Sequence, residues 1–186
     1  KKRKGAIVRK TLGQLVQKRA ISPKQGALLF KIVTYFKPVH ILQIGTNMGL
    51  STLYLTSYAS GLQCIALESN PAFASVARET FKQARNPIDL REGDYTDLLP
   101  KALEDMEAVD FVYFNMQDDD ICCSSLFNKC VEQTHQNSVF VFKGIKSSSK
   151  MRIAWKEICS HPKVTVTMDL YALGIVFFND KLHKRN

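Results

Sequence analysis

The chain has 186 residues, 45 % of them apolar, which predicts one α/β domain with a buried core. No run approaches the roughly 18–20 apolar residues of a membrane span. The basic first residues are not followed by the apolar run of a signal peptide, so we expect them to lie inside a longer chain. The five cysteines are odd in number and lack CxxC spacing, which disfavours a disulfide framework and favours free thiols in a cytoplasmic protein.

The net charge of +9 is concentrated in the first third of the chain. Residues 1–67 contain eleven Lys and Arg and no acid, and Glu68 is the first acidic residue. Such asymmetry suits either a surface for nucleic acid or a solvated helix face. The lysines are not interleaved with aromatic residues that would stack on bases. We therefore favour the solvated face over a nucleic-acid partner.

Residues 1–37 are predicted to form a helical cap before the core. Apolar residues recur at helical spacing over 6–20. A second helix is predicted to begin at Ser22-Pro23-Lys24-Gln25, a capping box with proline at the first helical position, and to end before Pro38. These helices could pack against another subunit, so a homodimer is compatible with the cap.

Residues 38–186 are predicted to form the core, in which strands alternate with helices. The predicted strands cover residues 39–44, 63–67, 88–91, 109–114, 138–142, 164–171 and 175–178, and the predicted helices cover 50–59, 71–84, 96–106, 118–135 and 147–159. Only three residues separate the last two strands, which must be antiparallel because a parallel crossover needs a dozen or more residues. The pattern predicts an α/β, Rossmann-like doubly wound, mostly parallel seven-stranded sheet with a C-terminal antiparallel hairpin.

A glycine-containing loop follows the first predicted strand, in the run from Gln43 to Ser51. Ligands of doubly wound sheets bind beyond the carboxyl ends of the strands. Gly45 and Gly49 would let the backbone approach a ligand, and Ser51 could hydrogen-bond to an anionic group at the start of a helix. Asn47 stands where the dinucleotide pattern GxGxxG has its second glycine, which disfavours an NAD-dependent oxidoreductase.

Acidic residues follow the next two predicted strands. Glu68, followed by Ser69, ends the second strand, where an acid can accept both hydroxyls of a ribose. Asp94 and Tyr95 follow the third strand and could contact an adenine through its exocyclic amine and its ring face. An alternative of equal weight is that Asp94 or Thr96 only caps the following helix.

These motifs, in this order, resemble the class I S-adenosylmethionine (SAM) methyltransferases. Within them, "QIGTNMGLST" and "LESNP" are similar to the catechol-type O-methyltransferases, and "HPKVTVTMDLYALGIVFF" with Ala154-Trp155 resembles a bacterial branch of that group. The resemblance covers residues 38–180 and implies SAM as cofactor and a small-molecule acceptor. It implies a cofactor site made of Gly45, Thr46, Asn47, Gly49, Ser51, Glu68, Ser69, Asp94, Tyr95 and Asn115.

The sequence departs from that family where the family binds a divalent metal. Asn115 replaces an Asp after the fourth strand, Lys143-Gly144 replaces an acidic pair after the fifth, and the catalytic lysine position falls on Asp118. Gln43 also replaces the acid that usually precedes the glycine loop. Because Mg²⁺ prefers carboxylate ligands, we expect no metal site. The run of acids over 118–120 could replace those ligands, but it more simply suits a helix N-terminus.

The resemblance favours a metal-independent, SAM-dependent methyltransferase whose acceptor the sequence leaves open. Asn115 and Lys143 are the candidate catalytic residues, because they would stand at adjacent strand ends and contact an acceptor. One alternative is a non-catalytic SAM-binding or interaction protein that has lost the metal centre. Another is a nucleic-acid methyltransferase, which the basic N-terminal third would support.

Overall fold

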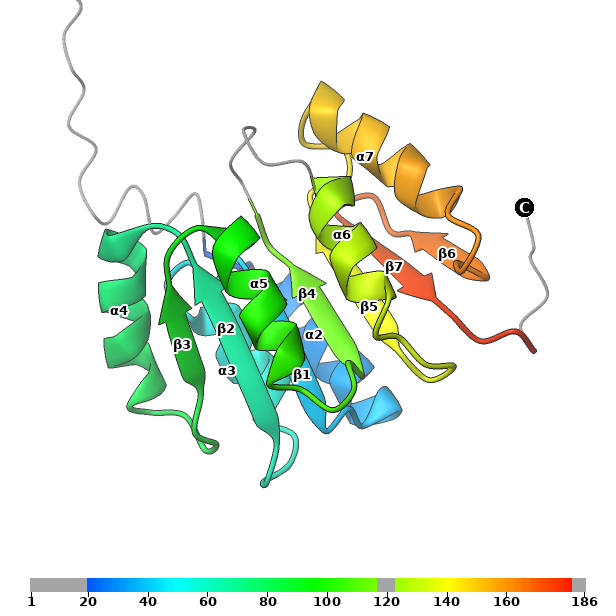
Figure 1. The fold of residues 1–186 in the computed structure, drawn as a ribbon. Helices are drawn as coiled ribbons and strands as arrows, with labels where there is room; N and C mark the ends of the chain where they lie inside the picture. The colour runs from blue at the N-terminus through cyan, green and yellow to red at the C-terminus, as the bar shows by residue number, and fades with distance from the viewer. Residues whose placement is uncertain (1–19, 117–122, 182–186) are drawn as a thin grey trace, which may run out of the picture.

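The computed structural model describes residues 20–116 and 123–181. Almost all of the predicted helix over 6–20, and the whole acidic run over 118–120, lie outside the described residues. The described part forms one seven-stranded sheet with helices on both faces (Figure 1).

The sheet has the order β3-β2-β1-β4-β5-β7-β6. Its strands are β1 (His40–Ile44), β2 (Gln63–Glu68), β3 (Asp89–Glu92), β4 (Phe111–Phe114), β5 (Val139–Lys143), β6 (Val166–Asp169) and β7 (Leu173–Phe177). The first five strands are parallel, and β7 runs antiparallel to both β5 and β6. The predicted doubly wound sheet with its antiparallel C-terminal hairpin is confirmed.

The helices lie close to their predicted positions but are shorter. They are α2 (Pro23–Phe36), α3 (Leu50–Thr56), α4 (Pro71–Phe81), α5 (Tyr95–Glu104), α6 (Cys123–Val131) and α7 (Ser149–Cys159). The predicted cap of α2 is confirmed, because Ser22 Oγ accepts a hydrogen bond from the backbone N–H of Gln25 at 3.3 Å. Lys37 caps the carboxyl end of α2: it has a left-handed φ of 51°, and its N–H donates to the carbonyl of Val33.

Successive side chains of each strand point to opposite faces of the sheet, so the core is divided into two layers. Figure 1 shows α5 and α6 in front of the sheet and α2 and α3 behind it. The layer under α5, α6 and α7 is aromatic, and the rings of Phe114 and Phe142 stack there with centroids 4.3 Å apart. The layer under α2 and α3 is built from fully buried aliphatic and aromatic side chains, including Leu29, Val33, Ile41, Leu55, Phe111, Tyr113, Val139 and Val141.

Helix α2 belongs to this second layer through Leu29, Ile32 and Val33. The division into a cap over 1–37 and a core over 38–186 stays a prediction. Within the described residues, no helix combines the length and the apolar character needed to cross a bilayer. Among the cysteines in the described ranges, Cys64, Cys123, Cys130 and Cys159 are free thiols.

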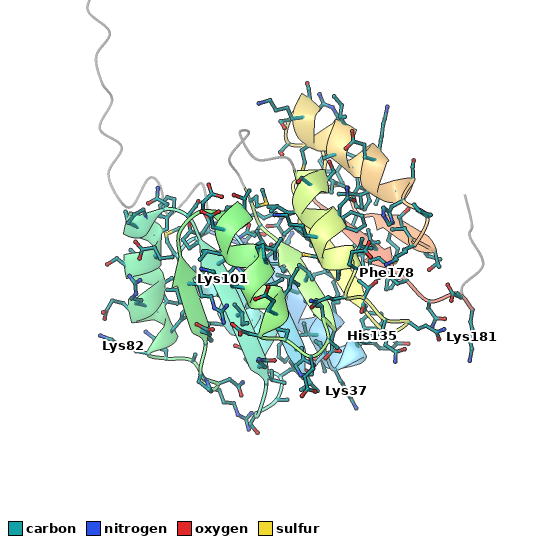
Figure 2. All side chains as sticks on the ribbon, in the orientation of Figure 1. Lys37, Lys82, Lys101, His135, Phe178 and Lys181 are labelled. Atoms are coloured by element: carbon teal, nitrogen blue, oxygen red, sulfur yellow. The ribbon has the colours of Figure 1, made fainter. Side chains whose placement is uncertain are left out.

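The carboxylate of Asp110 binds backbone N–H groups at the amino-terminal end of β1. Asp110 Oδ2 accepts hydrogen bonds from the backbone N–H groups of Val39 at 2.7 Å and His40 at 2.8 Å, and its Oδ1 lies 2.8 Å from His135 Nε2. Figure 2 shows His135 on this lower side of the molecule. Burial alone would raise the pKa of Asp110, but the hydrogen bonds from His40, His135 and Val39 outweigh it and hold the pKa below its usual value.

Candidate functional site

The candidate site lies where the chain connections diverge between β1 and β4. These strands are neighbours, but β1 leads to β2 on one side and β4 leads to β5 on the other. Such a switch point opens a crevice at the carboxyl ends of the strands. A small pocket lies here, and its lining residues are Ala20, Ile21, Thr46, Asn47, Met48, Leu50, Ser51 and Asn115.

The loop after β1 is tied to the end of β2. The backbone N–H groups of Gly45 and Thr46 both donate to the carbonyl of Leu67 at 3.0 Å, and Thr46 Oγ1 donates to the same oxygen at 3.1 Å. Thr46 is therefore placed in the predicted site, but its hydroxyl is used to hold the loop against the sheet.

The two glycines of the loop are required by the packing of the chain itself. Gly45 has a φ of +85°, and a Cβ there would lie 2.7 Å from the backbone oxygen of Asn115. Gly49 has a φ of +83°, and its Cβ would lie 2.6 Å from Cε1 of Phe81 on α4. Their conformation and close contacts explain both glycines without a ligand. Their predicted role of admitting a ligand stays a prediction.

Glu68 is held rigidly at the end of β2. Its side chain is buried at 3 % exposure, its Oε2 accepts from the backbone N–H of Asn47 at 2.6 Å, and its Oε1 accepts from that of Asn70 at 2.9 Å. Because a carboxylate oxygen can accept more than one hydrogen bond, this group can still receive the hydroxyls of a ligand. Asn47, with a φ of 51°, also donates from Nδ2 to the backbone oxygen of Asn115 at 3.2 Å.

The loop after β3 joins the same edge, because Gly93 donates from its N–H to the carbonyl of Glu68 at 3.0 Å. Asp94 caps α5, and its Oδ1 accepts from the hydroxyl of Thr96 at 2.6 Å and from its backbone N–H at 2.7 Å. These two bonds hold the pKa of Asp94 below its usual value. The capping alternative is thus realised, and it leaves the second carboxylate oxygen, Oδ2, outside the cap.

The other predicted residues of this edge are placed differently. Tyr95 is 3 % exposed and packs in the aromatic core layer, so its ring presents no open face. Ser69 is half-buried just after β2.

Gln43 organises the floor of the site, a role that sequence reasoning missed. Its side chain is fully buried, its Nε2 donates to Ser51 Oγ at 2.9 Å and to the Gly45 carbonyl at 3.2 Å, and its Oε1 accepts from Thr52 Oγ1 at 2.9 Å. A signal was available, because a glutamine inside an apolar central strand needs buried hydrogen-bond partners.

Asn115 and Lys143 stand at the ends of two neighbouring strands, β4 and β5. The register that pairs Phe114 with Phe142 places both at the carboxyl ends of neighbouring strands, roughly 4.8 Å apart in the direction across the sheet. Asn115 is 2 % exposed, and within residues 20–116 and 123–181 no hydrogen-bond donor contacts its Oδ1. Lys143 is half-buried, and this burial lowers its pKa.

Among the described residues, the ends of β4 and β5 offer a divalent metal ion one neutral amide oxygen and one ammonium group. This set does not fit Mg²⁺, which is usually held through one or two carboxylates. That no metal ion binds at these strand ends stays a prediction. In the part of the chain that the structure describes, no three His, Cys, Asp or Glu side chains converge to hold a metal.

The Rossmann-like fold and a polar site at its switch point define a class of nucleotide- and nucleoside-binding α/β proteins. A family model described as O-methyltransferase matches residues 4–148, and the chain belongs to that family. It is 29 % identical over 100 residues to catechol O-methyltransferase B of Danio rerio, covering 51 % of this chain and 38 % of that protein. It is 29 % identical over 89 residues to catechol O-methyltransferase of Niastella koreensis, covering 46 % and 40 %. The matches span about two fifths of these relatives.

Solved structures agree with the fold. The O-methyltransferase from Bacillus cereus, in complex with SAH (S-adenosylhomocysteine), superposes with a TM-score of 0.72 at 20 % identity, covering 92 % of this chain and 93 % of that one. The O-methyltransferase TomG from Streptomyces achromogenes, in complex with SAM, gives a TM-score of 0.74 at 19 % identity, covering 89 % and 86 %. At these identities the likeness establishes the fold.

Proposed function

We propose that this chain is a SAM-dependent methyltransferase that acts on a small-molecule acceptor without a metal ion. The observation that carries the proposal is Oδ1 of Asn115, a buried acceptor that has no hydrogen-bond donor among the described residues and lines the same pocket as Ser51. A buried acceptor without a donor is costly unless a ligand supplies one. An α-amino acid end suits this pair, because its ammonium group can donate to Asn115 and its carboxylate can accept from Ser51.

The remaining parts of the cofactor would be held at the ends of β2 and β3. Glu68 would accept from the ribose hydroxyls, and Asp94 would accept from the adenine amine. Gly45, Thr46, Asn47 and Gly49 would form the loop beneath it. When bound, SAM supplies a methyl group activated by its sulfonium.

The residues of this chain would contribute alignment and proton transfer. Holding an acceptor in line with the methyl group would lower the barrier by supplying proximity and orientation. We assign Lys143 to the acceptor, because burial lowers its pKa and so increases the fraction of neutral amine, which could take the proton of an acceptor hydroxyl. Asn115 would orient that acceptor. A cytoplasmic location and a homodimer remain predictions.

A second candidate function is a SAM-binding protein without transferase activity. The neutral and cationic residues at Asn115 and Lys143 favour it, because they stand where the related O-methyltransferases are expected to bind their metal.

Calorimetric titration tests the proposal, with SAH and NAD⁺ as parallel ligands, with and without Mg²⁺. We expect SAH to bind equally well in both conditions and NAD⁺ not to bind. Binding of NAD⁺ alone would contradict the proposal. Transfer of labelled methyl from SAM to a panel of phenols, carboxylic acids and amines, in the presence of EDTA, separates the two candidates. Binding without transfer to any acceptor favours the second.

A further inference from the structure

The end of β5, the loop after it and helix α7 are rich in basic residues. From Lys143 to Lys156 the chain has five Lys and Arg and no acid. Arg152 is held against this loop, because its Nη1 donates to the carbonyl of Lys146 at 3.3 Å and its Nη2 donates to Ser149 Oγ at 3.1 Å. A guanidinium has five N–H donors, so these two bonds leave it able to bind an anion as well.

The basic loop lies at the same end of the sheet as the candidate site. It begins at Lys143, the last residue of β5, and the N–H of Gly144 donates to the carbonyl of Ala172 at 2.8 Å. This bond joins the loop to the turn between β6 and β7. We call residues 143–152 and 169–172 together the basic rim.

The basic rim also presents an aromatic ring. Tyr171 is 75 % exposed, and its left-handed φ of 66° is rare for a bulky residue. Its N–H donates to Asp169 Oδ1 at 2.8 Å, while Lys146 Nζ lies 3.0 Å from Asp169 Oδ2 and 5.0 Å from the centroid of the Tyr171 ring. The ring is thus held at the surface beside a cation, where a flat acceptor can stack against it.

The chemistry of these residues favours an acceptor that is already an anion. A phenol, with a pKa of about 10, has to lose a proton to react, and a metal ion or a base assists that loss. A carboxylic acid, with a pKa of about 4, is ionised at neutral pH without assistance. The cations of the basic rim attract such a carboxylate. A carboxylate beside Lys143 also favours its ammonium form, which binds the acceptor and takes no proton.

Building on the proposed function, we propose that the acceptor is an aromatic carboxylate, which Lys143 and the basic rim bind and which leaves as a methyl ester. A lone pair of one carboxylate oxygen forms a bond to the methyl carbon of SAM, while the bond from this carbon to sulfur breaks and its electron pair stays on sulfur. One negative and one positive charge are neutralised, and no proton moves. Such a transfer needs neither a metal ion nor a general base.

Calorimetry on the SAH complex tests the anion site with benzoate and benzamide, two probes of similar shape that differ in charge. We expect benzoate to bind about tenfold more tightly or better, the effect of one hydrogen bond to a charged group. Lys143→Gln should weaken benzoate about tenfold and leave benzamide within about twofold. Lys156→Gln is the matched control, because it removes the same charge in the last turn of α7 and should change neither affinity.

A double variant tests the exposed part of the basic rim. Lys146→Gln combined with Arg152→Gln should weaken benzoate by a smaller factor, about two- to fivefold, because exposed charges contribute less than buried ones. Benzamide should again be unaffected.

The product distinguishes a carboxylate acceptor from a hydroxyl acceptor. Alkali hydrolyses a methyl ester to methanol, whereas a methyl ether is stable to it. With SAM labelled in the methyl group, benzoate and EDTA, we expect label that alkali releases as volatile methanol. Phenol in place of benzoate should take up no label.

Equal binding of benzoate and benzamide would overturn the inference, and so would the absence of alkali-labile label with benzoate. Either result leaves the proposed function standing, because the parent would still bind SAH. If the parent bound no SAH, the proposed function would itself be wrong. The affinity for SAH should stay within about twofold in every variant, which also reports that each variant is folded.

Discussion

The backbone N–H of Asn47 donates to Glu68 Oε2 at 2.6 Å, which joins the loop after β1 to the acid that ends β2. These residues lie 21 positions apart in the sequence. The bond holds Asn47 at its left-handed φ of 51°, a region that asparagine enters more readily than most other residues. Glu68 is therefore both a candidate ligand for a ribose and a support for the loop beside it.

Replacing Glu68 by Gln should weaken folding as well as ligand binding. One carboxylate oxygen becomes an NH₂ group, which would face the N–H of Asn47 or Asn70. We expect the free energy of unfolding to fall by about 1–3 kcal/mol, the cost of a buried donor that loses its acceptor. Urea denaturation measures this change, and SAH titration should show weaker binding. Glu92→Gln is the control, because Glu92 ends the neighbouring strand β3 in a partly exposed ion pair with Arg78 and should matter little. Equal losses in both variants would contradict the supporting role of Glu68.

Gly49→Ala should destabilise the chain more than Gly61→Ala. Both glycines have a positive φ, +83° and +77°, so alanine is strained by about 1–2 kcal/mol at either position. Only at Gly49 would the new Cβ meet a side chain, Phe81, whereas at Gly61 it meets nothing within 4 Å. Overpacking should add roughly 1–3 kcal/mol to the loss at Gly49. Urea denaturation of the two variants measures the difference, and equal losses would show that Phe81 moves aside freely.

The stability contributed by Asp110 should depend on pH. Its folded pKa lies below the unfolded value of about 3.9, so the ionised carboxylate stabilises the fold above that value, and the contribution is lost as the pH falls through the folded pKa. At pH 7, Asp110→Asn should cost about 1–2 kcal/mol of unfolding free energy through weaker hydrogen bonds. The gap between parent and variant should narrow in urea denaturation below about pH 4.

Asp180→Asn serves as the control for this pH series, because Asp180 is exposed near the end of the described chain. Its unfolding free energy should follow that of the parent at every pH. A gap between parent and Asp110→Asn that stays constant down to about pH 2.5 would show that ionisation of Asp110 is not coupled to folding.

The double change Asn115→Asp with Lys143→Asp should create divalent-metal affinity that the parent lacks. It would place two carboxylates at the ends of neighbouring strands, the ligand type that Mg²⁺ and Mn²⁺ prefer. Titration with Mn²⁺ should give measurable heat for the double variant and none for the parent, and each single variant should be weaker than the double. Metal binding by the parent that disappears when Asp118, Asp119 and Asp120 become Asn would show that those acids replace the expected ligands.

The order and type of the elements could be predicted, but not where the helices end. Apolar runs and turn signals located the strands, and the short hairpin fixed the direction of the last two. Helix α3 stops at Thr56, short of its predicted end, because Asn86 Nδ2 donates to the carbonyls of Thr56 at 2.7 Å and Ala59 at 2.8 Å. A capping side chain that arrives from 27 or more positions away leaves no local signal.

The location of the site was predictable, because parallel strands bring their carboxyl ends to the same end of the sheet. Ser51, Glu68 and Asn115 could be placed there from the sequence alone. The burial of Tyr95 could not, because the direction of a side chain at the start of a helix depends on the packing of the adjacent core. The hydrogen-bond directions set by Gln43 depend on three neighbours at once, which only the folded geometry brings together.

The position of β7 between β5 and β6 has a consequence for how the sheet is completed during synthesis. Strand β7 follows β6 in the chain but lies between β5 and β6 in the sheet, so one side of β5 stays unpaired until residues 173–177 have left the ribosome. Strand β5 has the sequence Val-Phe-Val-Phe-Lys. While one of its sides is unpaired, this apolar strand can pair with other chains. Chaperones that shield nascent chains would act on this edge, and a stop codon before residue 173 should yield an aggregating product rather than a shorter folded one.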